Sequence, residues 1–316
     1  MTARIKKSFS DLDVNPLLYW LTLTYLITRT IEKFTGTSEF WSSFWNGIID
    51  FFGEDDFNFK FLYTMIYLNI IYFGFGFLYV IMDITNKPKF MQKYKTQPEQ
   101  HQPLDMNKFL PALMVVIFNQ FILSGIAIYW TYRSGDWMLS TNIRETPTFT
   151  RLIAEIFGFG LTYEFVFYYS HRLLHHKSIY QYIHKVHHKW QAPVALMAAY
   201  CHPIEHIVSN LLPFIISNLL FRHTLATTWV IYAVAIISTL GDHSGYHLPF
   251  LHSPQFHDYH HLKFFENFGS NGFIDKFHGT NKKFEESIQG LRHRTLWSLK
   301  SSNELFPDDK VTEKEN

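Results

Sequence analysis

The chain contains 316 residues, of which 47% are hydrophobic and 18% aromatic, and its formal net charge is +1. This balance gives no basis for nucleic-acid binding, which depends on an excess of Lys and Arg. A single cysteine, Cys201, excludes a disulfide framework and metal sites built from several cysteines. The 32 Phe and 18 Tyr residues are typical of a chain in contact with lipid.

Two uncharged windows in the N-terminal half, 61–82 and 109–132, each exceed the ~20 residues that a helix needs to cross a bilayer. The window 17–31 is interrupted by Arg29 and is a weaker candidate. Between the two long windows the chain is rich in Lys and Pro, which is typical of a loop. We assign residues 1–150 to an N-terminal transmembrane region and expect no cleaved signal peptide, because no small-residue cleavage site follows an apolar core.

The C-terminal half begins with an apolar, aromatic window, 152–170, that carries Glu155 and Glu164. Two shorter apolar windows, 207–221 and 224–241, are separated by only two polar residues. Their lengths predict a helical hairpin that either spans the membrane or re-enters it. The second half therefore also contributes helices to a membrane protein.

Histidines are concentrated in this half, with 15 of 18 lying between His171 and His261. They form four clusters of matched spacing, HRLLH, HKVHH, HSGYH and HDYHH. Residues three and four apart share one helix face, so each cluster can direct its imidazoles at one point. Ten converging imidazoles predict a transition-metal site. The candidate ligands are His171, His175, His184, His187, His188, His243, His247, His257, His260 and His261.

The clusters define a second region, 151–290, and the charged remainder, 291–316, is expected to be a tail that is disordered after Asn303. A helical hairpin returns the chain to the side it left, so all four clusters can face one aqueous side. Basic residues near the clusters, and acidic residues in segment 35–60, predict that the clusters are cytosolic and that this segment lies across the membrane. The predicted fold class is all-α, a multi-pass membrane helical bundle with a cytosolic, histidine-rich di-metal helical cap.

Ten imidazoles are more than one zinc ion needs, so the set predicts two metal ions. Nitrogen ligands suit iron, zinc or copper, and affinity alone does not choose among them. A redox metal at the membrane surface, beside aromatic helices, is placed to activate dioxygen and oxidise a C–H bond of a lipid. Zinc hydrolysis would instead require an open water position and a catalytic carboxylate.

The histidine clusters also carry a family resemblance. The run YYSHRLLHHKSIYQYIHKVHHKWQAP, followed by YCHPIEH, GYHLPF, SPQFHDYHHLKF and HGT, resembles the histidine boxes of the fatty acid hydroxylase/sterol desaturase superfamily. Within it, the run is most similar to the fatty acid hydroxylase domain-containing relatives of C4-methylsterol oxidase. The resemblance covers about 163–280 and has no counterpart in the N-terminal half.

The resemblance implies a monooxygenase of the endoplasmic reticulum membrane with two iron ions, or zinc as isolated. It further implies the use of dioxygen and of electrons from NAD(P)H, relayed by a b-type cytochrome or a reductase. Family members act on sterols, fatty acyl chains, sphingoid bases and alkylglycerols. A sterol methyl group is the expected target, with an acyl or sphingolipid substrate as the alternative.

Four further residues are candidates to support the ligands. Glu164 shares a helix stripe with His171 and His175, so it is interpreted either as the acceptor of a ligand N–H or as half of an ion pair. Asp242 and Asp258 adjoin the clusters. His202 belongs to the HPIEH motif, where a supporting role is favoured over ligation.

Two other functions remain open at this stage. A membrane metal transporter or store would also collect histidines, but it would need ligands near the bilayer midplane and a polar path through the helices. A catalytically silent homologue could keep the same motif and act as a scaffold. The complete histidine set favours an enzyme over both.

Overall fold

The computed structural model describes residues 38–308 apart from 99, 101–102, 136–139 and 141. The candidate span 17–31 lies outside the described residues. The described part of the chain is helical and contains no β-sheet, only one isolated bridge between Lys95 and Tyr246. The all-α prediction is therefore confirmed.

The N-terminal half contributes two long membrane-type helical stretches, Asn58–Thr85 and Met106–Arg133. Each contains one π-helical turn, at Asn58–Tyr63 and Phe118–Leu123. Both stretches are 28 residues long with mean hydropathy of 1.9 and 2.0, so both are long enough to cross a bilayer. The two predicted spans are confirmed. The α-helices are α2 (Ser38–Phe52), α3 (Thr64–Thr85), α4 (Met106–Ile117) and α5 (Ser124–Arg133).

The C-terminal half contributes one long helix and a hairpin. The hairpin helices, Pro203–Phe221 and Leu225–Asp242, are both apolar and long enough to span a membrane. The turn between them forms because Arg222 adopts a left-handed conformation (φ 48°) and the Thr224 side chain caps the next helix by accepting from the Thr227 N–H. The α-helices are α6 (Phe149–Leu174), α8 (Pro203–Glu205), α9 (Leu212–Phe221) and α10 (Leu225–Asp242).

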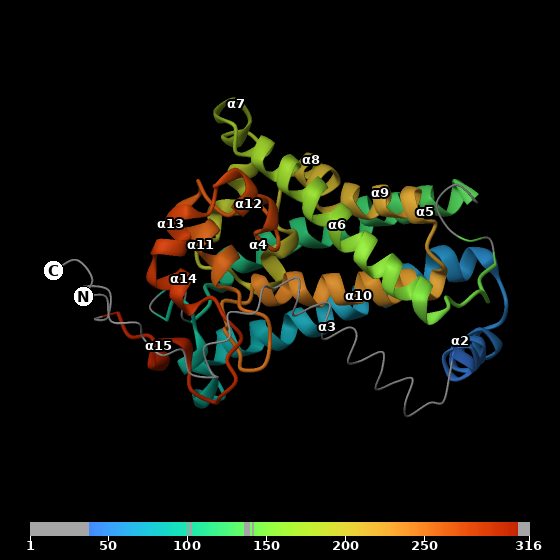
Figure 1. Cartoon of the computed structure of the whole chain (residues 1–316), viewed down its shortest axis with the longest axis horizontal. Helices are drawn as coiled ribbons and strands as arrows, with labels where there is room; N and C mark the ends of the chain where they lie inside the picture. The colour runs from blue at the N-terminus through green and yellow to red at the C-terminus, as the bar shows by residue number, and fades with distance from the viewer. Residues whose placement is uncertain (1–37, 99, 101–102, 136–139, 141, 309–316) are drawn as a thin grey trace, which may run out of the picture.

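The helices of the two halves form one bundle, in which α3 lies along α10 and α6 lies along α9 (Figure 1). Glycines allow the close approach of side chains at this packing. A Cβ at Gly76 would lie 2.2 Å from Leu196, and a Cβ at Gly158 would lie 2.3 Å from the Phe221 ring. Small residues have this role in membrane helix packing generally.

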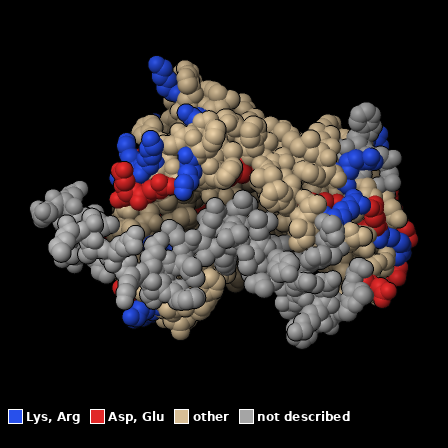
Figure 2. Space-filling model, in the orientation of Figure 1, with Lys and Arg blue, Asp and Glu red and all other residues tan. Residues whose placement is uncertain are grey.

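Short helices close one end of the bundle and form a cap, while α2 lies at the opposite end (Figure 1). The cap helices are α7 (Lys177–Tyr180), α11 (Gln255–Lys263), α12 (Phe273–His278), α13 (Lys282–Glu286), α14 (Ile288–Arg292) and α15 (Ser302–Leu305). Figure 2 shows that charged side chains gather at these two ends of the displayed face, with uncharged residues between them. This distribution matches a bundle whose middle lies in lipid.

A buried ion pair joins the cap to the bundle. Lys95 contacts Asp83 at the end of α3, and the Tyr246 hydroxyl donates to the same carboxylate over 3.0 Å. The Lys95 ammonium also lies 4.1 Å from the centre of the Tyr246 ring. Both charges are buried, so each depends on the other and on Tyr246 for compensation. The chain that follows α10 is thereby held against the loop that follows α3.

The C-terminal segment is ordered further than the sequence predicts. Arg292 is buried and donates to the carbonyl of Phe306 and to Asp308, and Ser301 forms a capping box with Glu304. The expectation of disorder after Asn303 is therefore wrong as far as Asp308. The charged composition of this segment predicted disorder because the segment has no apolar stripe. Its contacts are made through a few individual side chains instead.

Candidate metal centre

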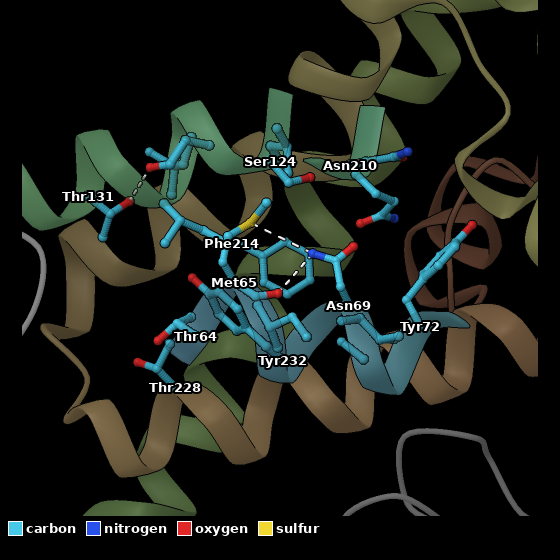
Figure 3. A pocket seen from close by; sticks show the side chains of 18 of the residues that line it. Thr64, Met65, Asn69, Tyr72, Ser124, Thr131, Asn210, Phe214, Thr228 and Tyr232 are labelled. Carbon is cyan, nitrogen blue, oxygen red and sulfur yellow. Dashed lines mark hydrogen bonds between the residues drawn. The ribbon is translucent and has the colours of Figure 1, made fainter. Parts of the chain in front are cut away.

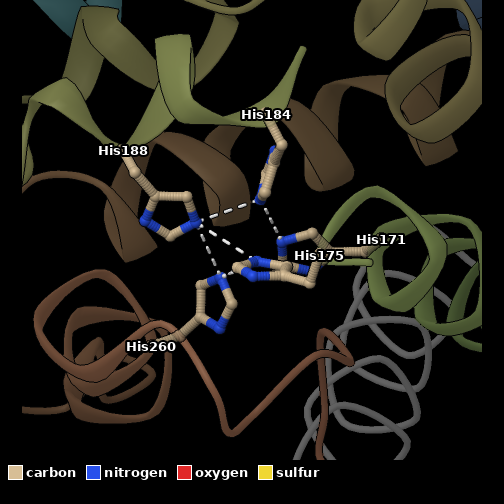
Figure 4. A group of neighbouring side chains, drawn as sticks. All are labelled: His171, His175, His184, His188 and His260. Carbon is tan, nitrogen blue, oxygen red and sulfur yellow. Dashed lines mark hydrogen bonds between the residues drawn. The ribbon is translucent and has the colours of Figure 1, made fainter. Parts of the chain in front are cut away.

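All four histidine clusters meet in the cap, as the parity of the hairpin predicts. One pair lies at the C-terminal end of α6, one cluster on the 3₁₀ turn His184–Lys189, one directly after α10, and one on α11. Their ligand nitrogens form two groups, in each of which all nitrogens lie within 4.8 Å of one another. The five-histidine group is His171, His175, His184, His188 and His260 (Figure 4). The four-histidine group is His187, His243, His257 and His261.

The sequence clusters do not each serve one point, which corrects the simplest interpretation of their spacing. In the 3₁₀ turn, His184 and His188 join the five-histidine group, while His187 between them joins the other. In α11 the assignment is reversed, because His257 and His261 join the four-histidine group and His260 joins the first. Side chains at i and i+4 thus point together, and the side chain at i+3 points to the neighbouring group. The 3₁₀ turn and α11 each supply histidines to both groups and thereby link them.

The outer nitrogens of four of the nine rings are held by hydrogen-bond acceptors. Four Nδ1 atoms face backbone carbonyls: His171 with Phe268 (2.7 Å), His187 with Tyr200 (3.2 Å), His243 with Thr239 (2.9 Å) and His260 with Glu266 (2.6 Å). A carbonyl can only accept, so in each pair Nδ1 carries the proton and donates it. The proton position leaves Nε2 of each ring with a free lone pair directed inward.

The inward nitrogens are crowded in a way that hydrogen bonding does not explain. Nε2 of His188 lies 3.0 Å from Nε2 of His184 and 3.2 Å from those of His175 and His260. A neutral imidazole nitrogen is either a donor or an acceptor, and it carries at most one proton. Metal–nitrogen bonds of ~2.1 Å bring neighbouring ligand nitrogens to about 3 Å from one another. The donor set therefore fits a cation at the centre of the group.

Burial keeps these rings uncharged. Desolvation lowers the pKa of His187 to about 4, and that of His260 to about 3, against an ordinary value of 6.5. The pKa of His184 is lowered well below 6.5, first by burial and then by the neighbouring imidazoles. Neutral imidazole is the form that binds a metal, so at neutral pH the set needs no deprotonation before it binds.

One buried carboxylate supports the ligands directly, and it is Glu205. Its Oε1 lies 2.7 Å from Nδ1 of His184, and the Glu205 side chain is only 5% exposed. A carboxylate on the outer nitrogen fixes the ring orientation and increases the basicity of the ligand. Glu205 lies between the two histidines of the HPIEH motif, and the spacing of those histidines did not identify it. An acidic residue at the start of an apolar window is the signal that identifies it.

Glu164 supports the site in a different way from the one predicted. Its Oε2 accepts from the backbone N–H groups of Ser270 and Asn271, and its Oε1 accepts from that of Ile274. Glu164 thus holds the loop after Phe268, whose carbonyl accepts from His171. Neither predicted role, direct acceptor for a ligand or half of an ion pair, appears among the described contacts of Glu164.

His247 lies outside both groups. The prediction placed it beside His243 on a continuing helix, but α10 ends at Asp242 and Gly245 turns the chain with φ of 68°. The backbone N–H of His247 donates to the Tyr94 carbonyl, and its Nε2 faces the Arg294 carbonyl at 2.9 Å. The structure therefore brings together nine of the ten predicted ligands.

The three remaining candidates contact other groups. Asp242 lies 3.6 Å from Nε2 of His252, and Asp258 accepts from Gln97. His202 caps α8 by accepting from the Ile204 N–H. None of the three has a described contact with a ligand ring, so the prediction that they orient ligands is not supported by the geometry.

A chamber opens between the membrane helices and extends to residues that support the four-histidine group. Its wall includes Thr239, whose carbonyl accepts from Nδ1 of His243. It also includes Ala199, the residue before Tyr200, whose carbonyl accepts from Nδ1 of His187. The middle is apolar, with Met65 and Phe214 facing inward (Figure 3). A mostly apolar wall with a few polar side chains is typical of a ligand-binding site.

Comparison with known proteins agrees with this geometry. The fatty acid hydroxylase sequence model matches residues 156–280, which contain every histidine of both groups. "Fatty acid hydroxylase domain-containing protein 2" of Homo sapiens is 36% identical over 293 residues, 92% of this chain and 88% of that protein. The chain belongs to the fatty acid hydroxylase family.

Other members of the family extend the comparison. "Methylsterol monooxygenase 1" of Gallus gallus is 33% identical over 64% of this chain and 73% of its own length. "Fatty acid hydroxylase ahd1" of Mycosarcoma maydis is 34% identical over 66% of this chain and 54% of its own. No solved structure matches the chain. The chain is thus an oxidoreductase of this family, and its relatives include proteins named methylsterol monooxygenase, as its histidine boxes predict.

Proposed function

We propose that this fatty acid hydroxylase is a monooxygenase that holds two iron ions and uses dioxygen to hydroxylate a C–H bond of a membrane lipid. The observation that carries the proposal is the pair of groups of inward-facing imidazole nitrogens beside a chamber between the membrane helices. Iron, when bound there, would supply the redox chemistry that dioxygen needs. Zinc in isolated protein is the alternative occupant.

The protein's own residues prepare the site. Backbone carbonyls and Glu205 contact the outer nitrogens of five of the nine rings, so much of the donor set is organised before a metal binds. One group offers five nitrogens and the other four. The four-histidine group therefore leaves more positions for oxygen or water, and it is the group beside the chamber.

The substrate we propose is a sterol, oxidised at a methyl group, because a relative named methylsterol monooxygenase is 33% identical over 64% of this chain. A relative named fatty acid hydroxylase makes an acyl chain or a sphingolipid the alternative substrate. A non-enzymatic metal-binding protein is a weaker proposal. Its ligands would need to lie along a path through the membrane, whereas both groups lie in the cap.

We further propose that the protein lies in the endoplasmic reticulum membrane with the cap in the cytosol. The basic residues of the cap support this orientation through the positive-inside rule. Electrons would come from NAD(P)H through a b-type cytochrome or a reductase. Glycosylation acceptors inserted near Lys177 and near Gly53 test the orientation: only the second is expected to be modified, and modification of the first would reverse the assignment.

Incorporation of labelled dioxygen tests the reaction. Microsomes containing the protein, supplied with NAD(P)H and a panel of sterols and acyl lipids, are expected to form a hydroxylated lipid that carries the label. The matched control is His187→Ala, which removes one nitrogen of the four-histidine group. Turnover without oxygen, or desaturation without incorporated label, would reject the monooxygenase proposal.

A further inference from the structure

One end of the membrane chamber carries a buried hydrogen-bond acceptor. Asn69 on α3 lines the chamber and is 8% exposed. Its Nδ2 donates to the Met65 carbonyl over 2.8 Å, which places the amide oxygen on the other side of the group. Among the described residues, Oδ1 of Asn69 has no hydrogen-bond partner. A buried acceptor without a donor destabilises the folded protein unless a ligand or a water molecule donates to it.

Asn69 lies at the end of the chamber that adjoins the metal centre. Figure 3 shows it beside Tyr72 and opposite Ser124 and Asn210. The Tyr72 hydroxyl donates to the Leu196 carbonyl and accepts from the Ala199 N–H, so this wall is fixed to the segment that leads to Tyr200. Ser124 contacts His206, which directly follows Glu205. Asn69 therefore lies one helical turn from Tyr72, which binds the segment that supplies the carbonyl behind His187.

An amide oxygen selects for a hydrogen-bond donor. Carboxylates, esters and ethers of lipids offer only acceptors, and an uncharged lipid most often offers a hydroxyl group. The middle of the chamber is apolar, so the body of such a lipid is accommodated by Met65 and Phe214.

We propose that Asn69 positions the substrate by accepting a hydrogen bond from a hydroxyl group that the lipid already carries. The chamber would then select lipids with a free hydroxyl close to the carbon that is oxidised. This inference rests on the proposed function and narrows its substrate class, since it favours hydroxylated lipids over acyl esters. Asn69 is a positioning residue, because it contacts the substrate's hydroxyl and neither metal group.

The test measures binding apart from turnover. Full-length protein in lipid nanodiscs, without reductant or oxygen, is titrated with a 4,4-dimethylsterol and with its 3-methyl ether. A second pair, hexadecanol and its methyl ether, distinguishes a ring body from a chain. One hydrogen bond of typical strength predicts that the alcohol of at least one pair binds about 5–10-fold more tightly than its ether. Equal binding within both pairs overturns the proposal.

Variants locate the acceptor. Asn69→Leu keeps the side-chain volume and removes the oxygen. It is expected to abolish the tighter binding of the alcohol relative to its ether, mainly by lowering the affinity for the alcohol. The control, Thr85→Val, lies on the same helix outside the chamber and is expected to keep the preference. Asn218 at the other end of the chamber also has an unpartnered buried Oδ1 among the described residues. If Asn218→Leu alone removes the preference, the hydroxyl binds there and the assignment to Asn69 is wrong.

The two levels of the proposal fail separately. If wild-type protein holds no metal and incorporates no labelled oxygen, the monooxygenase proposal fails, whereas the alcohol–ether comparison still reports on the chamber. If oxygen is incorporated but alcohol and ether bind equally, only the hydroxyl proposal fails. Should Asn69→Leu not fold, the wild-type comparison alone still decides whether a hydroxyl is recognised.

Discussion

The two histidine groups differ in the residues that hold their imidazole rings in place. Three rings of the five-histidine group depend on a carboxylate and on the loop after α11, through Glu205 and the carbonyls of Glu266 and Phe268. Two rings of the four-histidine group depend on backbone carbonyls of the bundle, at Tyr200 and Thr239. The first group is thus supported largely by the cap, and the second by the wall of the chamber. Similar ligand sets can therefore respond differently to the same kind of change.

Removing one ligand from each group is expected to have the largest effect. His260→Ala and His187→Ala should each lower turnover by more than ~100-fold, because each removes a metal–nitrogen bond rather than a supporting contact. Metal analysis should show loss of about one equivalent in each. The control is His176→Ala, an exposed histidine next to His175 that lies outside both groups. Full metal content and activity in both ligand variants would refute the assignment.

Glu205→Gln is expected to act on the five-histidine group alone. The amide keeps the volume but offers Nδ1 of His184 a weaker acceptor than the carboxyl group, so metal affinity of that group should fall by ~10–100-fold. Glu164→Gln provides the contrast, since it disturbs a loop and no ring directly. It should lower thermal stability and leave metal affinity nearer the wild-type value. Equal losses in the two variants would contradict the difference between direct and loop-mediated support.

Acid should weaken the metal-free protein through its buried imidazoles. Burial depresses the pKa of His187 from 6.5 to about 4 in the folded state, so between these values the unfolded chain binds more protons than the folded one. The contribution of His187 to the free energy of unfolding is therefore fully present above pH 6.5. It is lost as the pH falls toward 4, by on the order of 3 kcal/mol. Thermal melts of chelator-treated protein across this range measure it. His187→Ala should show a shallower dependence.

His247→Ala is expected to have the smallest effect on the metals. Its ring faces the Arg294 carbonyl, so the variant should keep both equivalents of metal while losing about 1–3 kcal/mol of stability from the buried contact. Metal content and denaturant unfolding measure the two effects separately. A loss of one metal equivalent, as in His187→Ala, would instead make His247 a ligand and equalise the two groups at five each.

Much of this molecule follows from patterns along the chain. The lengths of the apolar windows determined four membrane-type helices, because a bilayer imposes a minimum length whatever the neighbouring helices are. The parity of the hairpin determined that all four histidine clusters meet at one end. The resemblance of the histidine boxes determined the family. These features depend on local composition and on order in the chain.

The tertiary structure alone decided how the histidines are divided. Spacing gives the angle between side chains on one helix, but it does not state where that helix ends or which carbonyl lies behind each ring. His247 lies apart from His243 because a glycine turn follows the end of the helix at Asp242. Glu205 was missed because its partner, His184, lies in a different histidine cluster. The direction of a lone pair is set by the acceptor on the opposite nitrogen. That acceptor comes from another segment of the folded chain, so only the packing of the cap on the bundle determines it.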